Sequence, residues 1–258
     1  MFKKIVLVGA MLLFATNLWA AKVLDVSATR HNFGSTSSFG EGYYKATTED
    51  EVCIYCHTPH GGTLNTPLWN RSIPVGTGFT HYTSTTLSGY MTGVGMATRA
   101  VNPESLLCMS CHDGSVSINS ISNNSNRTGA APDMGGAIQP MFGEPGAVIG
   151  EASPVTAIPK VNDLSDDHPI SFSYYSAAAH VDNTGKLNLA DGGVKDPRDV
   201  GGPGLGVRLF GADAVGGQRV ECSTCHDPHV DGGADVAYSP FLVMPNTGSA
   251  LCLACHIK

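Results

Sequence analysis

Every cysteine of this chain stands in one short pattern that could attach a prosthetic group. The eight cysteines form four pairs with two residues between the members, and a histidine follows each pair at once. The motifs are Cys53/Cys56/His57, Cys108/Cys111/His112, Cys222/Cys225/His226 and Cys252/Cys255/His256. A lone CxxC could be a zinc or redox pair, and cysteines of an exported chain are ordinarily disulfide-bonded. Four CxxCH motifs that use every cysteine instead predict four covalently bound c-type haems.

The spacing within each motif suits this chemistry. Thiols three residues apart lie on one side of a helical turn, where both can form thioethers with two vinyl groups on one porphyrin edge. The histidine that follows can reach under the ring and offer a nitrogen to the iron. Two motifs follow helix-start signals: Thr48-Glu49-Asp50-Glu51 has the form of a capping box, and Asn102-Pro103-Glu104 supplies a capping residue and a first-position proline. We therefore expect short helices at the motifs.

The ligand on the opposite face of each iron separates an electron carrier from a catalyst. Ten histidines minus four motif histidines leaves six. The first and third motifs extend to CHTPH and CHDPH, which puts His60 and His229 three residues beyond the motif histidine. The second and fourth motifs, in LLCMSCHDG and ALCLACHIK, also resemble each other. The order is that of a duplicated two-haem module.

A further histidine precedes each copy of this module. His31 stands in HNFG and His168 in DDHPISF. One leading histidine and one CHxPH histidine per module give two distal ligands for two haems, twice over, so we expect His31, His60, His168 and His229 to bind iron. The histidines and methionines left over are His81, His180, Met91, Met96, Met109, Met134, Met141 and Met244. The alternative is that the four distal candidates are surface residues or partners of haem propionates.

The CHxPH element also constrains how far apart the irons lie. The Cα atoms of His57 and His60 are about 5–6 Å apart if helical and at most about 10 Å apart if extended. His60 therefore cannot reach the far face of the iron that His57 holds. It must bind a different iron close by, and the same holds for His229 beside His226. Neighbouring haems are expected to lie near contact.

The first 20 residues have the layout of a secretory signal peptide. MFKKIVLVGAMLLFATNLWA contains two lysines, an apolar run from Ile5 to about Thr16, and a small residue at Ala20. The run is shorter than the roughly 20 apolar residues that a bilayer requires, so we expect cleavage near Ala20 rather than an anchor helix. No later segment looks able to span a membrane. The mature protein is expected to be exported, in the periplasm or at the cell surface and beyond.

The composition excludes a basic nucleic-acid binder and indicates a thin side-chain core. Lysine and arginine number 15 against 22 acidic residues, a net charge of −7, whereas nucleic-acid binding needs a basic surface. Glycine and proline number 31 and 15, and aromatic residues are only 7%. We expect a mostly irregular, loop-rich fold with short helices at the haem motifs and a few short strands. The stacked haems would serve as the core.

The chain divides into segments by composition. After the signal peptide, a first dihaem module is expected over residues 21–125, a Gly/Pro-rich connection over 126–160, and a second dihaem module over 161–258. Within the second module, GVRLFG and QRVEC are predicted to be short strands. Residues 80–96 are predicted to be a loop, and Trp69 in PLWNR is expected to pack against a haem.

The motifs together resemble a known family. HNFG, CIYCHTPHGG with PLWNR, LLCMSCHDG, LSDDHPISF, VECSTCHDPH and LCLACHIK are similar to segments of multihaem c-type cytochromes of the CxxCHxPH type from metal- and mineral-respiring bacteria. The layout is similar to that of the OmcE-type tetrahaem cytochromes, which polymerise into extracellular filaments. The resemblance implies bis-histidine ligation of all haems. It also implies that His60 is donated across a subunit interface.

These observations favour an electron-transfer protein over an enzyme. Bis-histidine ligation leaves no open coordination site on the iron. The alternative is a periplasmic multihaem reductase, which needs one haem with a vacant face and acid–base groups nearby. All four motifs are CxxCH, without a CxxCK variant, and there are enough histidines to cap each iron. The expected partners are other cytochromes or further copies of this chain.

Overall fold

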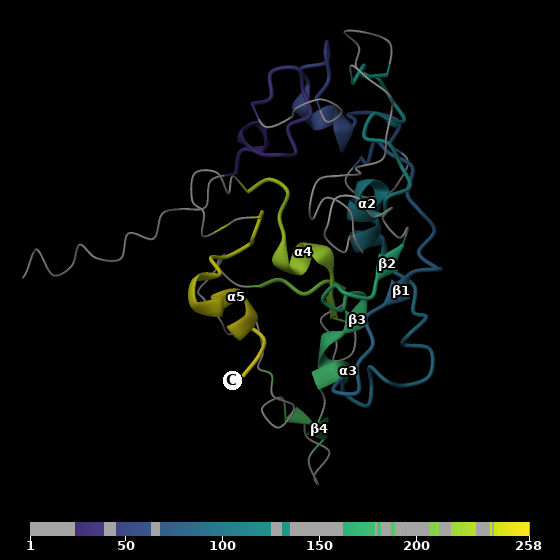
Figure 1. Cartoon of the computed structure of the whole chain (residues 1–258), viewed down its shortest axis with the longest axis vertical. Coiled ribbons are helices and arrows are strands. Elements are labelled where there is room, and N and C mark those ends of the chain that lie inside the picture. The colour runs from purple at the N-terminus through teal and green to yellow at the C-terminus, as the bar shows by residue number, and fades with distance from the viewer. Residues whose placement is uncertain are drawn as a thin grey trace, which may run out of the picture.

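A computed structural model of the chain describes residues 24–38, 45–62, 68–124, 131–134, 162–178, 207–211, 218–230 and 240–257, together with Val194, Tyr238 and the backbone of 180–181 and 187–188 (Figure 1). All the cysteines and nine of the ten histidines lie in these ranges with their side chains described; the side chain of His180 is not. The signal peptide predicted for residues 1–20 lies outside the described residues. So does most of the predicted connection, of which only 131–134 are described.

Helical segments accompany all four CxxCH motifs. The α-helices are α2 (Pro103–His112), α3 (Tyr174–Ala178), α4 (Cys222–Cys225) and α5 (Ala250–Leu253), and the 3-10 helices are η1 (Val26–Ala28), η3 (Val52–Tyr55) and η7 (Thr247–Ser249). α2 holds its whole motif, with Asn102 as N-cap residue and Pro103 at the first position. Proline is tolerated there because its missing N–H would have no helical partner. The other three helices contain the first part of their motifs and end before the histidine.

The capping box predicted at Thr48 is wrong. The first motif begins in the 3-10 helix η3, whose N-cap residue is Glu51 and which has no side-chain cap. The carboxylate of Glu49 accepts a hydrogen bond from the backbone of Glu51, only two residues on. This local bond competes with helical capping, as short-range side-chain bonds to the backbone commonly do. A capping box does occur at α4, where Glu221 and Thr224 bond each other's backbone.

The described strands form three short pairs. β1 (Thr80–His81) runs parallel to β2 (Asp163–Leu164), β3 (Phe172–Ser173) antiparallel to β6 (Arg219–Val220), and β4 (His180–Val181) antiparallel to β5 (Leu187–Asn188). QRVEC contains β6, as predicted, whereas GVRLFG contributes a single bridge from Phe210 to Arg219. Residues 80–96 begin in β1 and continue as turns. The β1–β2 pair joins residues from the two segments that were predicted to be separate modules.

Buried apolar side chains gather in three small clusters, and each cluster packs against one motif cysteine. The first contains Phe33, Ala46, Ile54, Tyr55, Ile118 and Met134 beside Cys111. The second contains Phe79, Val101, Leu106, Met109, Leu164 and Ile170 beside Cys222. The third contains Tyr174, Tyr175, Leu209 and Val220 beside Cys255. The apolar packing of the described residues is therefore distributed around the motifs and not gathered in one centre.

A buried carboxylate ties α2 to α4, which lie side by side in Figure 1. Glu221 is 1% exposed. Its two oxygens accept hydrogen bonds from Asn102 at 2.6 Å, Ser105 at 2.6 Å and Ser171 at 2.9 Å. The three donors offset part of the cost of burying the carboxylate, and burial still raises the pKa of Glu221. The second and third motifs are thereby held together by one side chain.

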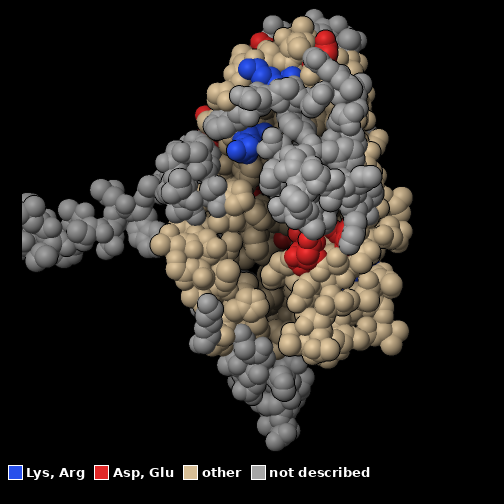
Figure 2. Space-filling view, viewed as in Figure 1, with Lys and Arg blue, Asp and Glu red and all other residues tan. Residues whose placement is uncertain are grey.

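The described surface carries few charges. Figure 2 shows a face that is largely uncharged, with small separate groups of basic and acidic residues. This agrees with a charged fraction of 14%, below the roughly 25% of an ordinary soluble domain. In the part of the chain that the structure describes, no helix is long and apolar enough to cross a bilayer.

Candidate functional site

Three of the four motif histidines each face one predicted distal histidine. The pairs and the distances between their ring centres are His57–His229 at 6.4 Å, His31–His112 at 6.1 Å and His168–His256 at 6.4 Å. Two imidazole nitrogens bonded to one metal from opposite sides, each at about 2.0 Å, put the ring centres roughly 6 Å apart. The spacing in all three pairs therefore fits one metal ion between the rings.

The pairing crosses the two predicted modules. His229 belongs to the third motif, yet its ring lies opposite His57 of the first. The sequence left open which distal histidine serves which motif, and the structure places this one opposite a motif of the other predicted module. Among the described residues, no ring contact joins His229 to its neighbour His226, and its use as a ligand of another iron stays a prediction. A backbone bridge between Leu24 and Val230 lies next to His229 and connects this segment to the N-terminal part of the described chain.

Three imidazoles have an Nδ1 atom hydrogen-bonded to an acceptor oxygen, which leaves Nε2 able to bind a metal. The bonds run from His168 to the Pro169 carbonyl at 2.8 Å, from His226 to the Pro240 carbonyl at 2.9 Å, and from His229 to the Asp227 carboxylate at 2.9 Å. Each of these oxygens can only accept, so Nδ1 carries the proton. The lone pair is then left on Nε2, the arrangement found in metal-bound histidines.

His31 is the most deeply buried of the distal candidates. Its ring stacks on Phe241, with centres 4.4 Å apart and planes 16° from parallel. Its Nδ1 atom is buried without a hydrogen-bond partner. Burial, reinforced by the neighbouring His112, lowers the pKa of His31 to about 4. Desolvation by the surrounding chain also lowers the pKa of His168, although its side chain is more exposed than that of His31. Both rings are therefore held neutral, the state in which an imidazole binds a metal.

The remaining motif histidine and the remaining distal candidate do not meet. No second imidazole ring faces His226 within the described ranges, and His60 is exposed. The backbone around His60 is nevertheless held: Thr58 donates to its carbonyl at 2.7 Å, and Asn123 donates to the next carbonyl, that of Gly61, at 3.0 Å. The structure thus presents His60 at the surface on a restrained segment.

The other histidine with a described side chain has a structural partner. His81 is 3% exposed, and its Nε2 bonds the carbonyl of Arg99 at 2.8 Å. Two of the methionines considered as competing ligands, Met109 and Met134, belong to the apolar clusters.

The cysteines of successive motifs approach one another. None of the eight forms a disulfide. Cys108 and Cys222 hydrogen-bond each other, which raises the pKa of Cys108 and lowers that of Cys222. The pairs close enough to interact electrostatically are Cys56 with Cys111, and Cys225 with Cys255. The attachment points of motifs one to four therefore adjoin in chain order.

The PLWNR segment braces the first two motifs. Trp69 forms a backbone bridge to His57, and its ring stands edge-on to the imidazole at 5.6 Å. Its Nε1 donates to Ser110 in α2 at 3.2 Å. Arg71 is fully buried and donates to the carbonyls of Ser110, at 3.2 Å, and Ser117, at 2.6 Å. Trp69 thus contacts a motif histidine, and Arg71 holds the C-terminal end of α2.

Sequence reasoning missed Asp227, Phe241, Glu221 and Arg71. The first could have been found, because an aspartate two residues before a histidine in CHDPH is placed to bond its ring. The long-range contacts of Phe241, Glu221 and Arg71 join residues far apart in the chain, and no local sequence pattern predicts them.

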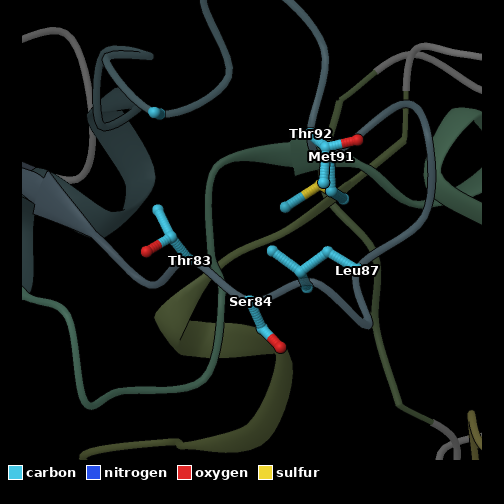
Figure 3. Close-up of a pocket in the computed structure, with 6 residues that line it drawn as sticks. Thr83, Ser84, Leu87, Met91 and Thr92 are labelled. Atoms are coloured by element: carbon cyan, nitrogen blue, oxygen red, sulfur yellow. The ribbon is translucent and has the colours of Figure 1, made fainter.

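A small pocket lies away from these residues. It is lined by Thr83, Ser84, Leu87, Met91, Thr92 and Ala97. Figure 3 shows the Leu87 and Met91 side chains pointing into the space between them and Thr83. The lining offers no titratable group. Within the described residues, no three His, Cys, Asp or Glu side chains form a group that could hold a bare metal ion, whereas a porphyrin iron needs only two protein ligands.

The chain matches no protein-family model and no curated protein. Its assignment therefore depends on the motifs and on the geometry described above.

Proposed function

We propose that this chain is a tetrahaem c-type cytochrome that transfers electrons through closely spaced, bis-histidine, low-spin haems. The observation that carries the proposal is the set of three histidine pairs with ring centres 6.1–6.4 Å apart. Each pair joins a CxxCH histidine to a distal candidate singled out from the sequence. A spacing of about 6 Å is what two imidazoles sharing a metal require, and it recurs in each pair.

The donor set also fits a haem. Twelve residues would attach and ligate the four groups through the CxxCH motifs: Cys53, Cys56, His57, Cys108, Cys111, His112, Cys222, Cys225, His226, Cys252, Cys255 and His256. The distal ligands would be His31, His168 and His229 within the chain. Bound haem supplies a one-electron iron couple. The two histidines of each pair would hold the iron from both sides and would keep other ligands off it.

Short distances between centres follow from the cysteine contacts. Attachment points of successive motifs adjoin, with Cys108 and Cys222 in hydrogen-bond contact. His226 and His229 lie three residues apart and would serve different irons. The first and third sites are therefore linked by one short segment. Such spacing supports electron hopping between centres and gives the protein its proposed role in extracellular respiratory electron transfer.

The positions of His226 and His60, which do not face each other within the described chain, support a polymer. His226 has no second imidazole opposite it among the described residues, and His60 is exposed on a braced turn. His60 of one copy would complete the His226 site of the next, and repetition of this contact would give a filament. A head-to-tail contact of this kind does not close on itself unless the rotation between copies forms a ring.

The same observation favours one alternative. If no other copy supplies a histidine, the iron at His226 keeps an open position, as a periplasmic multihaem reductase would require. The structure describes no acid–base group placed opposite His226.

Electron paramagnetic resonance of the oxidised protein, with haem quantification, tests the proposal. Four haems per chain with low-spin signals only are expected for the secreted, assembled protein. A stoichiometric high-spin iron that binds carbon monoxide when reduced would favour the reductase over the electron carrier. Material without a Soret band would overturn both.

A further inference from the structure

The third motif contains a carboxylate that holds the distal ligand of another motif. Asp227 Oδ1 accepts two hydrogen bonds from His229, one from the backbone N–H at 3.0 Å and one from ring Nδ1 at 2.9 Å. Because one oxygen receives both groups, this turn sets the position of the ring and assigns its proton to Nδ1. The Asp227 side chain is 27% exposed and that of His229 is 52% exposed, so the contact lies at the surface.

The other distal candidates lack this carboxylate. Nδ1 of His168 meets a neutral backbone carbonyl, and Nδ1 of His31 is buried without a partner. In the matching copy of the motif, position 58 holds threonine, whose hydroxyl donates to the backbone of His60. Among the described distal histidines, only His229 has a ring hydrogen-bonded to a charged group.

Given the proposed function, we propose that Asp227 is a positioning residue that makes the His57–His229 site the centre of lowest reduction potential among the three described pairs. A carboxylate that accepts the Nδ1 proton increases electron density at Nε2. A more strongly donating ligand stabilises the oxidised iron over the reduced iron, and the potential falls. A neutral backbone carbonyl, such as the one that His168 meets, does this less.

The orientation of the rings makes this site recognisable. The planes of His57 and His229 are 14° apart, whereas those of His31–His112 and His168–His256 are 77° and 69° apart. Each imidazole raises the energy of the iron d orbital that lies perpendicular to its own plane. When the two ring planes are parallel, both imidazoles raise the same d orbital and separate it in energy from the second one. When the planes are perpendicular, each imidazole raises a different d orbital and the two orbitals stay close in energy. A rhombic low-spin spectrum is expected from the first site and a single large-g feature from the other two.

The experiment compares the holoprotein with Asp227→Asn and Asp227→Thr, the second being the residue that the matching copy carries. Redox titration is followed by electron paramagnetic resonance, so that each midpoint is assigned to its signal. We expect the rhombic centre to titrate lowest in the wild type. We expect both variants to raise the midpoint potential of this centre by about 59 mV. This shift corresponds to a roughly tenfold change in the one-electron equilibrium constant. The midpoint potentials of the two large-g centres should not change.

Asp113→Asn is the matched control. Asp113 follows a motif histidine directly, as Asp227 does, but its oxygens accept from Ser115 at 2.8 and 2.6 Å. This variant should leave the rhombic midpoint unchanged. The proposal falls if the rhombic centre is not the lowest, if its midpoint does not move in either Asp227 variant, or if all midpoints move together. None of these results disturbs the carrier assignment, which fails only if haem is absent or an open iron is present.

Discussion

The imidazole rings of His57 and His229 lie 6.4 Å apart and 14° from parallel, although one belongs to the first motif and the other to the third. His229 is anchored to Asp227, and His57 is bridged to Trp69. Each partner is thus oriented by its own segment before any metal binds. The two halves of the chain meet at this pair, so a ligand set inferred one module at a time is incomplete.

Replacing His229 by alanine should open one iron. The first-motif site would lose its distal imidazole, and the rhombic signal should give way to a high-spin signal of one iron per chain. Carbon monoxide titration of the reduced protein and electron paramagnetic resonance of the oxidised protein measure the change. His81→Gln is the control, because that histidine bonds Arg99 and faces no motif histidine. A spectrum that stays fully low-spin would exclude His229 as a ligand.

Replacing His60 by alanine should shorten or abolish the assembly. The exposed imidazole would no longer complete the His226 site of another copy, and isolated chains should show one high-spin iron. Negative-stain microscopy and size-exclusion chromatography of secreted material report the size. His180→Ala, which removes a histidine outside every motif, should leave the assembly intact. Wild-type material consisting only of discrete small particles would count against the polymer.

Replacing Phe241 by alanine should loosen the His31–His112 site. Phe241 has a φ of 57°, a left-handed conformation that costs energy outside glycine, and its ring stacks on His31. Loss of the ring should lower the free energy of unfolding by about 1 kcal/mol and give partial carbon monoxide binding at this iron. Phe241→Tyr retains the stack and should behave as wild type. Equal ligand binding in the two variants would show that the stack does not restrain His31.

Replacing Glu221 by alanine should destabilise the junction of α2 and α4. The donors of Asn102, Ser105 and Ser171 lose their acceptor, at about 1–3 kcal/mol for each donor left buried and unpaired. Glu221→Gln keeps one acceptor oxygen and should cost less. Denaturant unfolding of the holoprotein measures both. Glu51→Gln changes an exposed carboxylate without a side-chain cap bond and should stay within about 0.5 kcal/mol.

His81 should make stability depend on pH. Burial lowers the pKa of His81 below its ordinary 6.5, so the unfolded chain binds a proton more readily than the folded one. The contribution of His81 to the free energy of unfolding is therefore fully present above pH 6.5 and is lost as the pH falls toward the folded-state pKa. His81→Gln keeps an N–H donor for the Arg99 carbonyl and does not titrate. Unfolding of the holoprotein between pH 7 and 5 should show a smaller loss in this variant, and equal slopes would contradict the assignment.

Much of the candidate site follows from spacing within a few residues. The CxxCH motifs, the CHxPH extension and the leading histidines single out the side chains that the structure brings into three facing pairs. The start of α2 follows from Pro103 at the first helical position, and β6 from the apolar residues around Val220. The capping side chain predicted at Asn102 makes no cap bond, because its amide donates to Glu221 instead. The first helix start was mispredicted because Glu49 bonds a nearer backbone N–H than the capping position requires.

The sequence by itself determined the four candidate attachment motifs and singled out His60 and His229, because attachment and the reach of a neighbouring histidine depend only on backbone length over three to five positions. Only the tertiary structure decided that His229 faces His57, that His31 faces His112, and that His60 stays at the surface. Those relationships depend on contacts between segments far apart in the chain, such as the β1–β2 pair and the Glu221 junction. No periodicity or local spacing encodes such contacts, because they form only when separate segments pack together.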